Sequence, residues 1–195
     1  MQMKISVTRK KGDVDFKDFQ AFAKALKKRS VTIGVHKAEG NKTNEISGTK
    51  VIDYACYNEF GNGNNPPARP FVRVKEDRKL REDIKVKEKS TLEKFAQNKF
   101  ADNKVSMVQE LYGEVGKLYL KEMTNRIEDS HNYYQGNAPR TIKQKGFDHP
   151  LIDTTLLGNS LKAKIRVGEG DSVEKVISTD KFNPVASITR KGNRN

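Results

Sequence analysis

The sequence is short of the residues that disulfides, metal sites and membrane spans require. Its 195 residues include one cysteine, Cys56, so an internal disulfide is excluded. The three histidines, His36, His131 and His149, are widely spaced and form no HxxxH or CxxC arrangement, so we expect no zinc site. No apolar run approaches the roughly 20 residues that cross a bilayer, and residues 1–11 lack the apolar core of a signal peptide. We therefore expect no membrane contact, and a protein made and used in a cytoplasm or in a particle assembled there.

Apolar side chains are also scarce, which limits the core that one copy of the chain can build. Hydrophobic residues make up 34% of the sequence, and the mean hydropathy is −0.81. The length suits one domain, which we place at residues 1–180. Residues 181–195 hold four basic residues and no acid, and this predicts a flexible basic arm. A composition with so few apolar residues favours an elongated subunit that buries further apolar surface against copies of itself.

Positive charge is in excess. The chain has 38 Lys and Arg against 25 Asp and Glu, a formal net charge of +13. Such a balance favours polyanionic partners, of which nucleic acid is the commonest. The alternative is a solvated basic surface that faces acidic protein neighbours, and the sequence leaves both open.

Alternating polar and apolar residues predict four short strands, at residues 4–8, 31–35, 162–167 and 173–178. Each is too short to be stable alone, so we expect all four in one small, mostly antiparallel sheet. Residues 168–171 (GEGD) are expected to form the turn of a hairpin. An edge of this sheet is expected to pair with a neighbouring subunit.

Helices are predicted at residues 16–28, 49–60, 104–128 and 155–160, and a highly charged one lies within 73–104. Together with the sheet they predict the fold class: α+β, with long helices packed on a small sheet. The helix at residues 16–28 presents one apolar face, and the helix at residues 104–128 carries a near-heptad apolar stripe. The face consists of Phe16, Phe19, Phe22, Ala23 and Leu26, and the stripe of Val105, Val108, Leu111, Val115, Leu118, Tyr119 and Met123.

Smaller residues mark where these elements begin, end and bend. Asp13 and Asp15 are candidate caps for the first helix, and Pro70 suits the first turn of the charged one. Gly61 is predicted as a left-handed stop after the second helix. Gly113 and Gly116 weaken the helix at residues 104–128 or permit close packing.

Three further local expectations concern residues outside this framework. Residues 37–48 are predicted as a polar loop, and residues 138–146 as a loop that ends at a glycine break. Cys56 lies in the apolar run VIDYACYNEF, where we expect it to pack as a small hydrophobe. His149 is expected in a surface loop.

Patterns typical of enzymes are missing. Glu59, Asp129 and Asp153 are candidates for a nuclease carboxylate cluster, but their spacing does not support one. The run GNGNN lacks the GK[ST] ending of a phosphate loop. Tyr133 and Tyr134 lie near basic residues, so they either stack on bases or, as we favour, fill a subunit interface. We expect no enzyme activity and no cofactor.

Two segments carry a recognisable pattern. The first is Tyr57-Asn58-Glu59-Phe60-Gly61 followed by Pro67-Ala68-Arg69-Pro70-Phe71. The second is Thr141-Ile142-Lys143-x-Lys145-Gly146, then Pro150-Leu151-Ile152-Asp153-Thr154, then Asn159-Ser160-Leu161. In order and separation they resemble the tail-component and tail-completion families of tailed bacteriophages, which act at the head-to-tail junction. The resemblance spans roughly residues 31–167. Thr155 stands where the family has a glycine, and the basic tail after Phe182 has no counterpart.

The resemblance implies a structural virion protein of the neck, a tail-completion or tail-terminator protein that joins the tail to the head connector. Its partners would be copies of itself in a ring, a hexamer or dodecamer, with neighbouring connector and tail-tube proteins and genomic double-stranded DNA in the lumen. A different class, a stand-alone basic nucleic-acid-binding or nuclease-like protein, is the alternative.

The motif residues have expected roles in that setting. Arg69 suits a bidentate contact with a carboxylate, Leu151 and Ile152 anchor the second segment in the core, and Asp153 caps the helix that follows. The motif and interface residues are Glu59, Phe60, Gly61, Pro67, Arg69, Pro70, Phe71, Lys145, Gly146, Pro150, Leu151, Ile152, Asp153, Thr154 and Ser160. Candidates for contact with DNA or through the arm are Arg140, Lys143, Arg190, Lys191 and Arg194.

Overall fold

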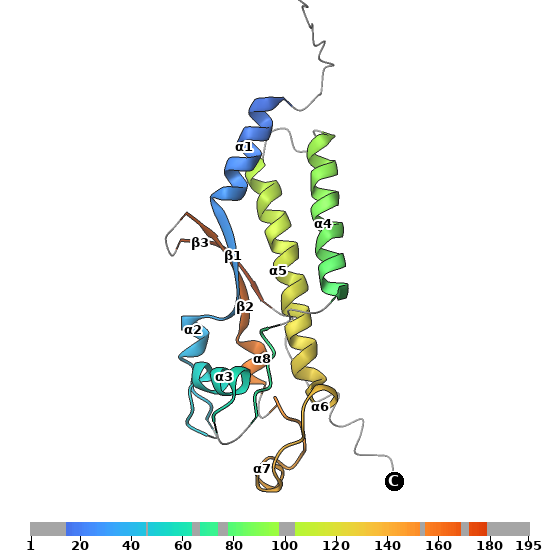
Figure 1. Ribbon diagram of the computed structural model, residues 1–195. Coiled ribbons are helices and arrows are strands. Elements are labelled where there is room, and N and C mark those ends of the chain that lie inside the picture. Colours follow the sequence, from blue (N-terminus) through green and yellow to red (C-terminus); the bar gives the residue numbers. More distant parts are fainter. Residues whose placement is uncertain are drawn as a thin grey trace, which may run out of the picture.

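The computed structural model describes residues 15–45, 47–63, 67–73, 78–97, 104–152, 155–168 and 172–178, and shows an elongated α+β subunit (Figure 1). The predicted fold class is therefore confirmed. The elements are α1 (Phe16–Lys27), β1 (Arg29–Val35), α2 (Lys37–Gly40), α3 (Val51–Phe60), α4 (Arg78–Ala96), α5 (Lys104–Glu128), α6 (Ser130–Tyr133), α7 (Pro139–Lys145), α8 (Leu156–Asn159), β2 (Leu161–Val167) and β3 (Val173–Ser178).

The three strands form one antiparallel sheet in the order β1-β2-β3. Val31, Ile33 and Val35 pair with Ile165, Ala163 and Leu161, and this set faces the core. The alternation in the sequence predicted this because one face of the sheet is buried and the other is not. The strands at 31–35, 162–167 and 173–178 are confirmed, and β2 and β3 pair as the two arms of the predicted hairpin. Residues 169–171 of its turn and the strand predicted at 4–8 lie outside the described residues.

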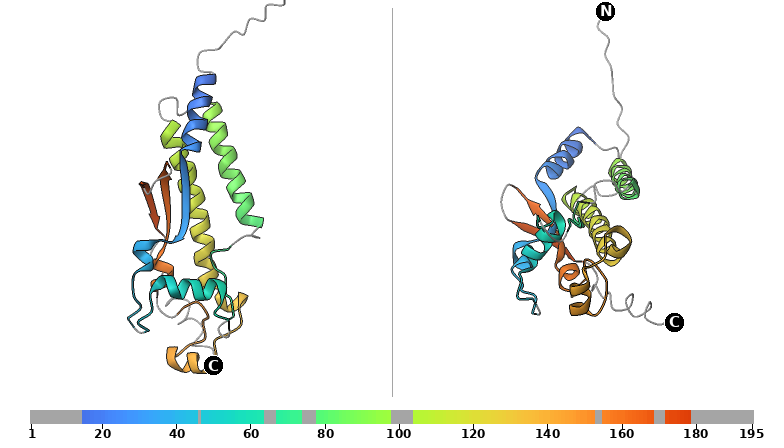
Figure 2. Two further views of the ribbon diagram at one scale, coloured as in Figure 1. Left: turned by 60° about the vertical axis from the view of Figure 1, so that its left-hand side comes forward. Right: turned by 60° about the horizontal axis from the view of Figure 1, so that its bottom comes forward.

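Helix α5 runs along the buried face of the sheet, with α4 antiparallel beside it (Figures 1 and 2). It approaches the strands closely at Gly116. A Cβ atom built on Gly116 would lie 2.9 Å from the Cβ of Ala163 and 3.6 Å from Cγ2 of Val31. The close packing that we expected is therefore present at Gly116, whereas a Cβ on Gly113 would meet Ile177 Cδ1 at an ordinary contact distance of 3.7 Å.

The apolar stripe predicted on α5 is only partly the buried one. Val108 and Met123 are buried, but Val105 is 41% exposed and Leu111, Val115, Leu118 and Tyr119 are half-buried. The buried line instead passes through Met107, Val108, Gly113, Gly116, Leu120, Met123 and Ile127. The difference arises because α5 packs mainly on a sheet through its glycines, whereas a heptad stripe describes packing against another helix.

The core has two parts, one at each end of α5. The larger part joins α5 and the sheet to Val51 of α3, Phe71, Leu151 and Leu157. The smaller part lies at the far end, where Phe22 of α1 stacks on Phe95 of α4 with ring centroids 4.6 Å apart. One long helix therefore links two apolar clusters.

Helix α1 begins as the sequence indicated but buries less than its apolar face predicted. Asp15 forms a capping box with Asp18, whose backbone N–H donates to the Asp15 carboxylate at 2.8 Å. Phe22 is buried, whereas Phe16 and Phe19 remain 68% and 56% exposed. The face is apolar along its whole length, but the N-terminal half of α1 contacts α5 through the ion pair of Asp18 with Lys104 at 2.7 Å, while Phe16 and Phe19 stay exposed. Asp13 lies outside the described residues.

Two segments predicted as loops contain helices. Residues 37–48 include α2, and an isolated bridge between Thr43 and Lys50 closes the remainder. Residues 139–145 form α7, with Pro139 in its first turn and Gly146 as a left-handed cap at φ 80° and ψ 0°. Proline at the start of a helix and glycine just past its end are boundary signals. Our prediction treated Pro139 and Gly146 as residues that prevent a helix, although they mark the two ends of one.

Other boundaries differ in detail. Gly61 has φ 78° but ψ 171°, so it ends α3 with an extended rather than a left-handed helical residue. Pro70 lies in a non-helical segment, and the described part of α4 begins at Arg78. Cys56 is exposed rather than packed, because α3 turns Val51 and Ala55 toward the core and leaves this position outside.

Replacement of Gly116 by alanine is expected to lower the free energy of unfolding by about 1–3 kcal/mol, the usual range for overpacking. The matched control is Gly113→Ala, because a Cβ there meets nothing nearer than Ile177 Cδ1 at 3.7 Å. The control should gain helix propensity, up to about 1 kcal/mol. Urea denaturation of both variants measures the difference, and equal stabilities would contradict the close contact of α5 with the sheet.

Candidate functional site at the junction of the two motif segments

The two motif segments meet at one end of the molecule, below the sheet in Figure 1. Arg69 makes the connection. Its side chain is 5% exposed, and its terminal nitrogens donate to four carbonyl oxygens: Asn137 Oδ1 (3.2 Å), Pro150 O (3.3 Å), Gln135 O (3.0 Å) and Gly136 O (3.2 Å). No carboxylate of the described residues bonds to Arg69, so the bidentate carboxylate contact that we expected for it stays a prediction. The guanidinium instead binds carbonyl oxygens of the turn that precedes α7 and of Pro150, which follows α7.

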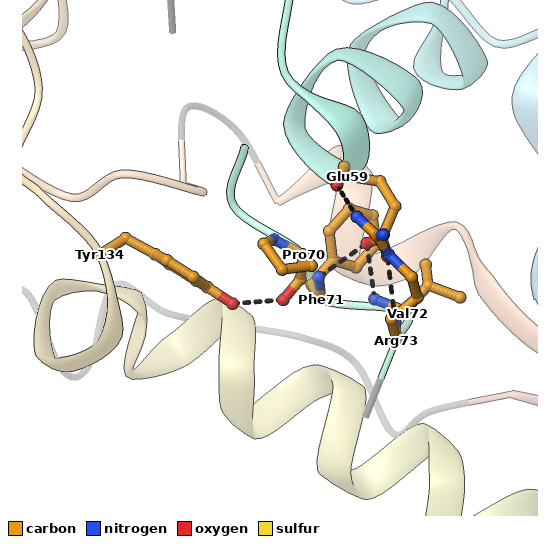
Figure 3. Close-up of polar contacts among 6 residues, drawn as sticks. All are labelled: Glu59, Pro70, Phe71, Val72, Arg73 and Tyr134. Carbon is orange, nitrogen blue, oxygen red and sulfur yellow. Dashed lines mark hydrogen bonds and ion pairs between the residues drawn. The ribbon is translucent and has the colours of Figure 1, made fainter. Parts of the chain in front are cut away.

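Glu59 fixes the first segment from the last turn of α3 (Figure 3). The residue is 4% exposed. Its Oε2 accepts hydrogen bonds from the backbone N–H groups of Phe71 (2.8 Å) and Val72 (2.9 Å). Its Oε1 accepts from the backbone N–H and from Nε of Arg73, at 3.1 and 2.8 Å. One carboxylate thus satisfies three consecutive backbone donors of a loop that has no secondary structure of its own.

Neighbours complete this anchor. Arg73 also donates to the backbone carbonyl of Glu59, and its guanidinium lies 4.9 Å from the centre of the Phe60 ring. The hydroxyl of Tyr134 donates to the carbonyl of Pro70 (Figure 3). Phe71 is fully buried as a result. The loop is therefore held from both sides, by α3 and by the segment after α6.

The second segment is anchored through Ser130. Ser130 Oγ lies 2.9 Å from Nδ1 of His149 and accepts from the backbone N–H of Leu151 at 3.3 Å. Tyr54 donates to the carbonyl of Leu151 at 2.9 Å. Leu151 and Ile152 are buried, which confirms the anchoring role that we expected for them.

His149 is buried rather than part of a surface loop, because the Ser130 contact draws its ring inward. Burial lowers the pKa of His149 below its ordinary value of 6.5, and the charges of His131 and Lys145 act in the same direction. The ring of His131 lies 5.2 Å away, edge to face. The neutral imidazole is therefore the form that the fold favours.

The remaining predicted residues occupy varied positions. Ser160 is buried and donates to the carbonyl of Leu156 at 2.7 Å. Phe60, Pro67, Gly146, Arg140 and Lys143 are exposed, and Gly61, Pro70 and Lys145 are half-buried. Asp153, Thr154, Arg190, Lys191 and Arg194 lie outside the described residues. The structure thus joins Glu59 with Phe71 and Arg69 with Pro150, while leaving Arg140 and Lys143 at the surface of α7.

Sequence reasoning missed several residues that build the junction. Arg73, Asn137 and Ser130 were not singled out, although each bonds to a motif residue. The sequence signal for Arg73 is its position, two residues after the first motif. Asn137 and Ser130 precede the second motif in a stretch that was considered for its aromatic residues.

An open groove of about 880 Å³ lies beside the junction. Both motif segments line it, through Pro67, Arg69, Thr141, Lys145 and Pro150. A third wall comes from residues 44–49, the segment that the bridge between Thr43 and Lys50 closes. As far as the structure describes it, its lining is rich in amide and hydroxyl side chains and contains no aspartate, glutamate or histidine.

Side chains suited to metal binding do not gather among the described residues. No set of three or more His, Cys, Asp or Glu side chains there is placed to hold a metal ion. The Glu59 carboxylate is occupied by backbone donors, and Asp129 is exposed. None of the described helices combines the length and apolarity of a membrane span. The arrangement as described is suited to binding.

The chain matches no protein-family model, no curated protein and no solved structure. The geometry of the junction is therefore the basis for a functional proposal.

Replacement of Glu59 by alanine is expected to lower the free energy of unfolding by about 3 kcal/mol or more. The reason is that each buried donor left without an acceptor costs about 1–3 kcal/mol. Glu82→Ala is the matched control, because Glu82 forms an exposed ion pair with Arg78 and such pairs contribute about 0–1 kcal/mol. Thermal and urea unfolding of both variants measure the effect. Similar losses in the two variants would contradict the role of Glu59 as the anchor of the loop.

Stability is expected to decrease as the pH falls below about 6.5. The pKa of His149 is lower in the folded chain than in the unfolded one, so the unfolded chain binds the proton more readily and acid favours unfolding. The contribution is complete above the unfolded value of about 6.5 and is lost below it. His149→Gln should make the melting temperature less sensitive to pH between about 7.5 and 5.5. A dependence of the same sign should remain from His36, whose pKa is also lowered by burial. A variant as sensitive as the parent would show that His149 is not responsible.

Proposed function

We propose that this chain is a structural subunit of the head-to-tail junction of a tailed bacteriophage. In this proposal copies form a ring in the virion neck that completes or terminates the tail and joins it to the head connector. The genomic DNA passes through the ring, and the subunit has no enzymatic role. The observation that carries the proposal is that Arg69, in the first segment that resembles the family signature, donates to the carbonyl oxygen of Pro150, in the second segment, at one end of the subunit.

The shape of the subunit and its exposed apolar residues support assembly into a ring. The molecule is elongated, with α1 and the neighbouring ends of α4 and α5 at the end remote from the junction (Figures 1 and 2). Phe16 is 68% exposed at that end, and Phe60 is 67% exposed at the junction. Large aromatics at both ends are suited to contacts between neighbouring subunits or rings.

The outward face of the sheet supports contact with a polyanion. Lys162, Lys164 and Arg166 alternate along the central strand β2, on the face opposite the core residues Leu161, Ala163 and Ile165. Lys164 lies 3.4 Å from the Glu39 carboxylate, and Arg166 donates to Thr32 Oγ1 at 3.2 Å. Burial lowers the pKa of the adjacent His36, and the positive charge of Lys164 lowers it further. This row of cations is suited to phosphate groups.

The same row of cations favours the second candidate function, a basic protein that binds nucleic acid alone. The two functions differ in assembly. A neck subunit binds its neighbours first and contacts DNA from within a ring, whereas a stand-alone binder has high affinity as a monomer.

We expect the purified full-length chain to form closed rings with a central opening. Mass photometry and negative-stain microscopy measure the stoichiometry and the opening. Titration of a 30-base-pair duplex at several salt concentrations measures the affinity of the unassembled subunit for DNA. A chain that stays monomeric and binds this duplex with micromolar or tighter Kd and a steep salt dependence would contradict the neck assignment in favour of the alternative.

A further inference from the structure

The groove beside the junction has the chemistry of a binding site for an acidic peptide. We propose that it receives an extended segment of a partner protein and holds one of its carboxylate side chains near Arg69 and Asn137. This inference goes beyond the proposed function, because it concerns a single subunit and holds whether or not rings form.

Donors without an acceptor, on two side chains that line the groove, are the first reason. Arg69 and Asn137 both line the groove, and the buried atoms Arg69 Nε and Asn137 Nδ2 have no hydrogen-bond partner in the part of the chain that the structure describes. The orientation of the Asn137 amide is fixed by its Oδ1, which accepts from Arg69. Buried donors without acceptors are rare in folded proteins and cost about 1–3 kcal/mol each. A carboxylate oxygen brought by a ligand is the kind of acceptor that these donors lack.

The charge of the lining is the second reason. The charged side chains among its described lining residues are Arg69 and Lys145, both cationic. Lys145 donates to the carbonyl of His149 at 2.8 Å, which holds its ammonium group at this wall. The nearby Asp148 is not part of the lining, and its carboxylate accepts from the backbone N–H of Asn137 at 2.7 Å. The groove therefore presents positive charge to an incoming segment.

The shape and composition of the groove favour a peptide over a compact ligand. Three separate stretches of chain, at residues 44–58, 67–69 and 135–150, contribute walls. Amide and hydroxyl side chains such as Gln144, Thr141 and Ser47 offer both donors and acceptors to a peptide backbone. Tyr57, which is 48% exposed, adds an apolar surface.

The chain's own C-terminal arm is not the expected occupant. Residues 181–195 carry four basic residues and no acid, so they would place like charges beside Arg69 and Lys145. An acidic segment of another protein has the complementary charge.

The test uses the full-length protein and a fluorescein-labelled decapeptide of alternating glycine and glutamate. The comparison peptide has glutamine in place of glutamate, and free glutamate is the third probe. We expect saturable binding of the acidic peptide, at least tenfold tighter than that of the glutamine peptide. In ¹⁵N spectra the peptide should shift the Arg69 Nε–H and the Asn137 side-chain amide.

Variants at Gln144, an exposed groove residue on α7, separate the groove from the general positive charge of the chain. Gln144→Glu should weaken binding of the acidic peptide at least fivefold, and Gln144→Lys should strengthen it. The control Gln97→Glu changes the net charge equally, at an exposed position after α4, and should have little effect. Equal binding of the two peptides, equal effects of Gln144→Glu and Gln97→Glu, or free glutamate binding as tightly as the peptide would each overturn the proposal. Ring formation is measured independently, so neither result decides the other.

Discussion

The loop at residues 67–73 stays in place because the Glu59 carboxylate gives its backbone N–H groups the acceptors that they would otherwise find only in water. The carboxylate lies in the last turn of α3, where the helix dipole disfavours negative charge. Three backbone donors and the guanidinium of Arg73 outweigh this effect. Arg73 also bonds to the carbonyl of Glu59, one of the carbonyl groups that a helix end leaves without an intrahelical partner.

The rest of the junction follows from this anchor. Once the loop is fixed, Phe71 enters the core and Arg69 points at the turn between α6 and α7. Arg69 then binds four carbonyl oxygens that belong to segments more than 60 residues further along the chain. The groove obtains its floor from the same residues, so a change at Glu59 reaches the groove through the position of Arg69.

The sequence predicted those elements in which buried and exposed residues follow a regular pattern. The strands at 31–35 and 162–167 are clear because each turns one face to the core and one to solvent. The contacts of the junction had no such signal, since Glu59 and Arg69 bind mainly to backbone atoms, which every residue has. The exposure of Phe16 and Phe19 was also not predictable, because periodicity shows which side chains share a face but not how far the neighbouring helix extends.

The contact between Gly116 and Ala163 has a mechanical consequence. Helix α5 has 25 residues and is therefore about 38 Å long. Without a side chain at Gly116 its backbone packs closely against the central strand β2, and a shift of one helical turn in one direction would place Leu120 in the same gap. A shift in the other direction would place Gly113 there. We therefore expect this contact to resist sliding of α5 along the sheet in one direction more than in the other.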